Sequence, residues 1–227
     1  MAGFFAEYGR EMLQSTREHM VLTLIAMLIA CAIAIPLGIL LARSRLKFLV
    51  NIIMGLVNVI QPIPSLALVA LTVVIFYLIN QFLGVHALAT LGMAPAMVAL
   101  VAYALLPILR NTYTGIRQVD QAVVEVATGM GMTQRQILFS VQLPLALPFI
   151  MAGIRISTVW TIGVATLVSL VGAGGLGDLI FRGLSNYRIH LILAGAAPAA
   201  ALALIFDWLL GRLEKWLTPG EFQEAKV

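Results

Sequence analysis

The chain has 227 residues, of which 61% are hydrophobic and 11% are charged, and its mean hydropathy is +1.02. Because soluble domains carry about 25% charged residues, this composition excludes an ordinary water-soluble globule. The net charge is +4, but the basic residues stand in short clusters between apolar runs, which favours membrane topology signals over a nucleic-acid surface.

The expected elements are membrane-spanning helices, each of which needs roughly 20 apolar residues. Residues 20–42 form the first such run. Residues 48–80 form the second, but Pro62 and Pro64 interrupt it, and the piece before the break is too short to span alone. We therefore expect one broken span there. With the later runs at 93–109, 144–171 and 191–211, the sequence predicts an all-helical membrane protein with about five spans.

The basic residues are distributed unequally over the six segments that flank these spans. Three flanks hold Arg43, Arg45, Lys47, Arg110, Arg117, Arg135, Arg212, Lys215 and Lys226, and the other three hold only Arg10, Arg17, Arg182 and Arg188. The positive-inside rule then predicts an outer N-terminal tail over 1–18, a membrane domain over 19–212 and a cytoplasmic C-terminal tail over 213–227. A six-span alternative, split at Pro62, would place the basic loop 110–143 outside, against this rule.

Within loop 110–143, two short helices are predicted. Asp120 can cap the first, over 121–128, and Thr133 with Gln136 forms a capping box for a second that runs toward Leu143. Gly129 and Gly131 lie between them and predict a tight turn. Both helices are amphipathic, so the pair can dock into the groove of a partner protein or lie flat at the membrane surface, and the pattern favours neither.

One motif in this loop resembles that of a known family. Glu125-Val126-Ala127, then Gly131, then Val141-Gln142-Leu143-Pro144 resembles the EAA motif of the permeases of binding-protein-dependent ABC importers. Val126 stands where the motif has Ala and Val141 where it has Ile, and both changes keep the polarity.

The resemblance extends over nearly the whole chain and narrows the subfamily. Several further stretches are similar to the glycine betaine, carnitine and choline permeases of the osmoprotectant group: 36–38, 61–67, 153–155, 172–177, 186–188 and 195–198. Permeases of methionine importers share parts of these stretches, so an amino acid remains an alternative substrate.

The resemblance implies a type I, MetI-like ABC importer transmembrane domain in the bacterial inner membrane, with a periplasmic N-terminus. A coupling helix within 120–143 would contact a cytoplasmic ATPase, and the positions carried over to that contact are Glu125, Ala127, Gly131, Thr133, Arg135, Leu143 and Pro144. The implied partners are ATPase subunits, a periplasmic or lipid-anchored solute-binding protein and a second permease, identical or similar. The chain has no G-x-x-x-x-G-K-[ST] motif, so we expect no cofactor or catalysis on it, and ATP and Mg on the partner ATPase.

The residues of the helix break are the candidates for the transport pathway: Gln61, Pro62, Pro64 and Ser65. Non-helical backbone at membrane depth is tolerated only where protein or water covers it. A simple bend at the interface remains an alternative.

Three intramembrane side chains have both functional and structural interpretations. Arg155 is expected to be structural, because a cation on the pathway would repel a betaine's ammonium group. Tyr103 and Trp160 could face a quaternary ammonium, but helix packing is the more common role, and we do not include them among the predicted sites.

Two other classes of function fit the sequence less well. An ion-coupled carrier usually shows an internal repeat and paired intramembrane carboxylates, and neither is evident here. A membrane scaffold without transport is disfavoured by the broken helix and the coupling motif. Cys31 is the single cysteine and the three histidines are far apart in the sequence, so no metal site is expected.

Overall fold

The computed structural model describes residues 2–60, 62–84 and 88–217, and every regular element in these ranges is helical. The main helices are α1 (Ala2–Arg43), α2 (Lys47–Ile60), α3 (Ser65–Leu83), α4 (Met93–Arg117), α5 (Gln121–Gly129), α6 (Gln134–Ile137), α7 (Leu143–Leu167), α8 (Leu176–Ser185) and α9 (Ile189–Leu217). Within the described ranges, five helical segments are long and apolar enough to cross a membrane: Tyr8–Arg43, Ser65–Leu83, Met93–Arg117, Gln134–Val171 and Ile189–Leu217. The prediction of an all-helical protein with about five spans is confirmed.

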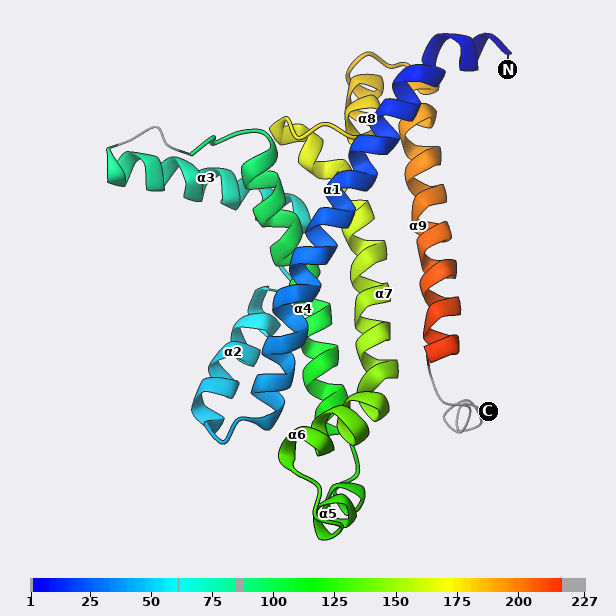
Figure 1. The fold of residues 1–227 in the computed structure, drawn as a ribbon. Coiled ribbons are helices and arrows are strands. Elements are labelled where there is room, and N and C mark those ends of the chain that lie inside the picture. The colour runs from blue at the N-terminus through cyan, green and yellow to red at the C-terminus, as the bar shows by residue number, and fades with distance from the viewer. Residues whose placement is uncertain (1, 61, 85–87, 218–227) are drawn as a thin grey trace.

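The long helices α1, α4, α7 and α9 run lengthwise beside one another, and α3 projects sideways from them (Figure 1). Helix α8 and the start of α1 lie at one end of the molecule, which we call the α8 end. Helices α5 and α6 lie at the opposite end, which we call the α5 end. Helix α9 runs from the α8 end toward the α5 end, so α1 begins and α9 finishes at opposite ends.

Small residues let the central helices approach closely. A Cβ atom on Gly38 of α1 would lie 2.8 Å from Thr112 Cβ of α4, and one on Gly153 of α7 would lie 2.7 Å from Asn111 Cβ. The Ser157 hydroxyl of α7 also donates to the Ala104 carbonyl of α4 at 2.6 Å. Helices in lipid lack a hydrophobic force between them, so such close contacts hold the bundle together.

The first helix extends further toward the N-terminus than the apolar run alone indicates. Helix α1 continues without interruption through residue 18, where the sequence predicts the end of a tail. Tyr8 and Met12 pack against a buried cluster formed by α8 and α9, and the side chain of His19 is fully buried. His19 Nε2 donates to the Ile162 carbonyl of α7 at 3.1 Å. These contacts explain why polar residues remain helical here.

The interrupted apolar stretch forms two helices separated at the prolines and contributes one candidate span, as predicted. Helix α3 is long enough to cross by itself, whereas α2 has 14 residues and buries Val50 and Val57 in a cluster with residues of α1 and α4. Between them, the Ile63 amide donates to the Ile60 carbonyl and Pro64 caps α3 with extended backbone angles. The prolines thus end one helix and start another, which a bend within a single span would not require.

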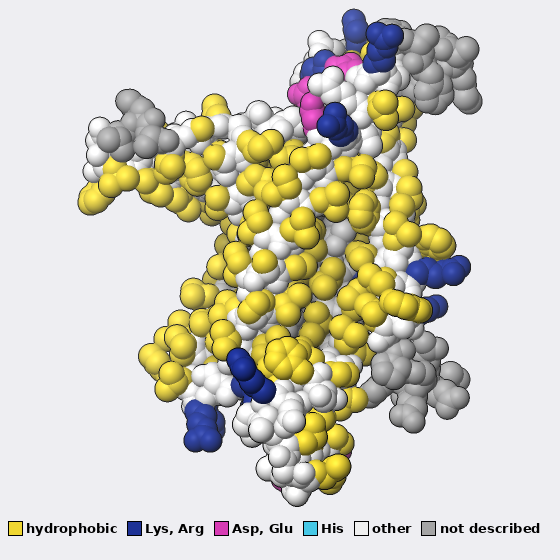
Figure 2. Space-filling model, viewed as in Figure 1, with side chains coloured by type: hydrophobic (Ala, Val, Ile, Leu, Met, Phe, Trp, Pro, Cys, Tyr) yellow, Lys and Arg dark blue, Asp and Glu magenta, His cyan; other side chains and the backbone are white. Residues whose placement is uncertain are grey.

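The molecular surface is apolar along its length. Figure 2 shows hydrophobic side chains over the middle of the visible face, with most of the charged side chains toward the two ends. Phe82 of α3 is 91% exposed, and Leu28 of α1 is 70% exposed. Lipid or another membrane protein must cover such a surface.

Candidate coupling segment and transport pathway

The segment 120–143 occupies the α5 end, beyond the spans (Figure 1). Asp120 begins it, and its carboxylate accepts a hydrogen bond from the Ala122 amide at 2.9 Å. Such a cap satisfies one of the free amides of the first helical turn, so the chain can start a new helix within a few residues of the end of α4. The predicted cap at Asp120 is confirmed.

Gly131 makes the turn between α5 and α6. Its φ is +82°, in the left-handed region that glycine adopts without strain. The Gly131 amide donates to the Thr128 carbonyl at 3.0 Å, and the Met132 amide donates to the Ala127 carbonyl at 3.1 Å. This pair of bonds is a Schellman motif, which ends a helix on a glycine. Gly129 instead lies within α5 at an ordinary helical φ. Of the two glycines, Gly131 is therefore the one whose backbone conformation favours glycine.

The second helix starts as predicted but does not end near Leu143. Thr133 and Gln136 form the expected capping box, with reciprocal bonds of 3.3 Å and 2.7 Å. After α6, a π-helical turn over Leu138–Gln142 leads directly into α7, and the Leu143 amide donates to the Leu138 carbonyl. Pro144 has no amide hydrogen to continue the regular ladder, which explains a wider turn just before it. Helix α6, the π-helical turn and span α7 therefore form one continuous rod.

Arg43, at the end of α1, holds this rod in place. Its Nη1 donates to Gln142 Oε1 at 2.5 Å, and its Nη2 donates to Gln134 Oε1 at 2.8 Å and to the Gln134 carbonyl at 3.2 Å. The sequence assigns Arg43 only a topological role, like its neighbours Arg45 and Lys47. No sequence signal distinguishes it, because its partners lie more than 90 residues later in the chain.

The motif residues divide into a buried and an exposed group. Ala127 is 5% exposed, and Leu143 is half-buried. Glu125, Gly131, Thr133, Arg135 and Pro144 are exposed. Among the described residues, the side chains of Glu125 and Arg135 form no hydrogen bond or ion pair. Beside them, Val126 is 63% exposed and Met130 is 76% exposed.

This surface has the composition of a contact site, with apolar side chains that lack cover and charges that lack partners within the described part of the chain.

The pathway candidates lie in and after the turn between α2 and α3. Gln61 lies outside the described residues. Pro62 and Pro64 are exposed in the turn, and Ser65 begins α3. Ser65 also lines a cavity of about 380 Å³ together with Tyr103 of α4 and Trp160 of α7. Of the four predicted positions, Ser65 is the one that the structure brings next to residues of other spans in a cavity.

Arg155 is paired, as the structural interpretation expects. Its Nε and Nη2 donate to the two carboxylate oxygens of Asp207 on α9, at 2.6 Å and 2.7 Å. Glu214, two turns further along α9, lies 3.6 Å from Nη1. A bidentate pair of this kind fixes the register of α7 against α9.

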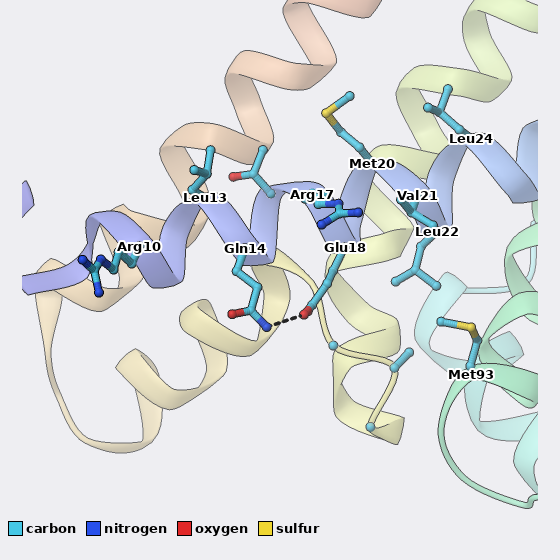
Figure 3. A pocket seen from close by; sticks show the side chains of 14 residues that line it. Arg10, Leu13, Gln14, Arg17, Glu18, Met20, Val21, Leu22, Leu24 and Met93 are labelled. Atoms are coloured by element: carbon cyan, nitrogen blue, oxygen red, sulfur yellow. Dashed lines mark hydrogen bonds between the residues drawn. The ribbon is translucent and has the colours of Figure 1, made fainter.

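At the α8 end, an open groove of about 1180 Å³ runs along the start of α1 (Figure 3). Arg10, Arg17 and Glu18 line it among apolar side chains, and the Gln14 amide donates to Glu18 Oε1 at 3.0 Å. The other Glu18 oxygen accepts from the Gly175 amide at 3.3 Å and so ties α1 to the loop before α8.

Nearby, Arg182 of α8 donates a hydrogen bond to Glu11, which raises the pKa of the guanidinium and strengthens the same connection between α1 and α8. Within the described residues, no group of three or more His, Cys, Asp or Glu side chains is placed to hold a metal ion.

Comparison with known proteins gives consistent results. A family model described as the binding-protein-dependent transport system inner membrane component matches residues 34–219. The chain is 47% identical to the carnitine transport permease protein OpuCB of Listeria monocytogenes, over 98% of this chain and 95% of that protein. It is 46% identical to the choline transport system permease protein OpuBB of Bacillus subtilis, over 98% and 96%.

Solved structures agree on the fold. An inward-facing structure of the MetNI methionine ABC transporter aligns with a TM-score of 0.79 and 22% identity, over 92% of this chain and 96% of that one. An amino acid ABC transporter solved with histidines aligns with a TM-score of 0.72 and 20% identity, over 93% and 96%. At such identities the likeness establishes the MetI-type fold and does not identify a substrate.

Proposed function

We propose that this chain, which belongs to the family of binding-protein-dependent transport system inner membrane components, imports a quaternary ammonium osmoprotectant by ATP-driven alternating access. The observation that carries this proposal is end-to-end similarity to osmoprotectant permeases. The glycine betaine/carnitine/choline permease OpuCB of Bacillus subtilis is 44% identical over the whole of this chain. Glycine betaine, carnitine and choline share a trimethylammonium group, so we infer that this group defines the substrate class.

The structural likeness to methionine and amino acid transporters does not compete with this assignment. Those chains are 20–22% identical, whereas the osmoprotectant relatives are 44–47% identical over nearly the full length. A family whose transport depends on a binding protein also argues against an ion-coupled carrier that works alone.

We infer that segment 120–143 transmits the movement of a separate ATPase, which binds ATP and Mg. The exposure of its side chains and its connection to α7 support this inference. The exposed side chains of Glu125 and Arg135 lack partners within the described residues, and the Gly131 turn presents them at the far end of a rod that is continuous with span α7. A rigid connection of this kind moves the span whenever the contact moves. Ala127, Thr133, Leu143 and Pro144 shape the rod through burial, capping and the π-helical turn.

The remaining parts of the proposal concern the pathway and the topology. We infer that the turn before α3, with Pro62, Pro64 and Ser65, borders the transport pathway, since Ser65 lines a cavity between spans. The α8 end would face the periplasm, where a binding protein delivers the solute, and the α5 end the cytoplasm. A second permease copy, identical or similar, would cover part of the exposed apolar surface.

The test begins with affinity purification of the chain from its native membrane and identification of the associated proteins by mass spectrometry. We expect a nucleotide-binding subunit and a solute-binding protein. In proteoliposomes, the complex should accumulate radiolabelled choline or glycine betaine only when ATP and the binding protein are present. If the chain is recovered alone and takes up solute under an ion gradient, the proposal is wrong and a carrier function replaces it.

A further inference from the structure

Two cavities lie along one face of α7. One, of about 430 Å³, is bordered by Arg155 and by Asp207 and Glu214 of α9, and the other, of about 380 Å³, by Ser65 and Tyr103. Val159 and Trp160 line both. The two cavities therefore adjoin each other at Val159 and Trp160.

Both aromatic side chains line the second cavity, where Trp160 is exposed and Tyr103 is half-buried. The ring centroids of Tyr103 and Trp160 are 6.2 Å apart with an interplanar angle of 46°, and Trp160 is 44% exposed although it lies near the middle of a span. In the described part of the chain, no cation stacks on either ring. Trp208 differs, because the guanidinium of Arg212 lies 5.0 Å from its ring centroid. The Tyr103 and Trp160 rings thus have unused faces that attract cations.

The charge of Arg155 in the neighbouring cavity is compensated. Arg155 alone would repel an ammonium group. In the structure, its guanidinium forms a bidentate pair with Asp207 and lies 3.6 Å from Glu214. An ammonium group that moves along this face of α7 therefore meets a paired guanidinium, and the repulsion expected of a lone cation is reduced.

We propose that Tyr103 and Trp160 form a contact site inside the permease for the ammonium group of the transported solute. The inference rests on the proposed function, because it takes a small quaternary ammonium compound as the occupant. The exposed ring faces support that occupant, since they attract a cation more strongly than they attract a lipid chain or an apolar face of another subunit. The carboxylate partners of Arg155 also reduce the repulsion that its charge alone would cause. Ser65 supplies a hydroxyl to the same cavity, within reach of a solute's oxygen atoms.

The experiment uses the complete complex, with ATPase and binding protein, in proteoliposomes. The rate of choline import and the rate of ATP hydrolysis are measured at saturating choline-loaded binding protein. Trp160→Leu should lower the number of choline molecules imported per ATP by about 3-fold to 30-fold, and Trp160→Phe should lower it less. Trp208→Leu is the matched control, because it also removes an exposed tryptophan from a span, and import should be unchanged.

A second series of variants keeps the shape of the indole ring and lowers only the electron density on its face. Tryptophan with one, two or three fluorine atoms is incorporated at position 160, which weakens the attraction for a cation stepwise. Import per ATP should fall with each fluorine atom. Equal import for all fluorinated forms would overturn the inference, as would equal losses for Trp160→Leu and Trp160→Phe, which indicate packing against lipid or a second subunit. Failure of the wild-type complex to import any quaternary ammonium compound would instead refute the proposed function.

Discussion

Gly131 sets the direction of the coupling segment through its backbone alone. No heavy atom lies within 4 Å of the Cβ that a larger residue would add, so there is room for a side chain, but the φ of +82° disfavours one. We expect Gly131→Ala to strain the turn by about 1–2 kcal/mol. That strain reduces the population of the native turn by about 5-fold to 30-fold relative to alternatives. ATP hydrolysis stimulated by the loaded binding protein should fall accordingly in the reconstituted complex.

Two variants separate backbone strain from added bulk at this turn. Gly129→Ala adds the same methyl group two residues earlier, also without neighbours within 4 Å but at an ordinary helical φ, and should preserve activity. Gly131→Asn should lose less than Gly131→Ala, because asparagine tolerates the left-handed region better. Equal activity of the three variants would show that the left-handed turn is not needed for coupling.

At the scale of elements, α1 and the rod formed by α6 and α7 are linked through Arg43. Arg43→Ala removes hydrogen bonds to Gln142 and Gln134 at a partly exposed position. We expect this change to weaken the attachment of the rod to α1 by about 1 kcal/mol. The rod could then move without α1. The number of solute molecules imported per ATP hydrolysed should fall about 5-fold while the complex still assembles.

Arg45 offers the control for this link. It is exposed, it has the same charge two residues later, and it makes no contact of this kind within the described residues. Arg45→Ala should leave import per ATP unchanged. A similar loss in both variants would mean that the positive charge of this loop matters and that the specific bonds of Arg43 do not.

Features that neighbouring residues determine are predicted correctly from the sequence, whereas features that depend on distant residues are not. The caps at Asp120 and Thr133 are correctly predicted because each depends on residues two or three positions away. The prolines at 62 and 64 predict a break, but whether α3 continues along α2 or projects sideways depends on packing against α4.

Long-range pairs lie beyond such local rules. The bond between Arg43 and Gln142, the pair of Arg155 with Asp207 and the meeting of Tyr103 with Trp160 all join residues more than 50 positions apart. Sequence patterns identify these residues as charged or aromatic, and only the folded helices make them partners. For the same reason the sequence favours packing for Tyr103 and Trp160, whereas the structure leaves their rings open to a cavity.

For the whole molecule, the decisive property is the direction in which it crosses the membrane. The single span α7 separates the coupling segment from α8 and so places them on opposite sides of the membrane, and the clusters of basic residues predict that the coupling segment is inside. Cys31 is the single cysteine, so Cys31→Ala yields a background without thiols. Into it, Ser185→Cys is introduced at the end of α8 and Gln121→Cys at the start of α5, both at exposed positions.

A maleimide that cannot cross membranes should label Ser185→Cys in intact cells whose outer barrier has been opened, and should leave Gln121→Cys unlabelled. In inverted membrane vesicles the result should reverse, because the α5 end then faces the reagent. This outcome places the exposed side chains of Glu125 and Arg135 on the side where ATP is available. Labelling of Gln121→Cys from outside would invert the topology and remove the coupling segment from any cytoplasmic ATPase, whatever its sequence resembles.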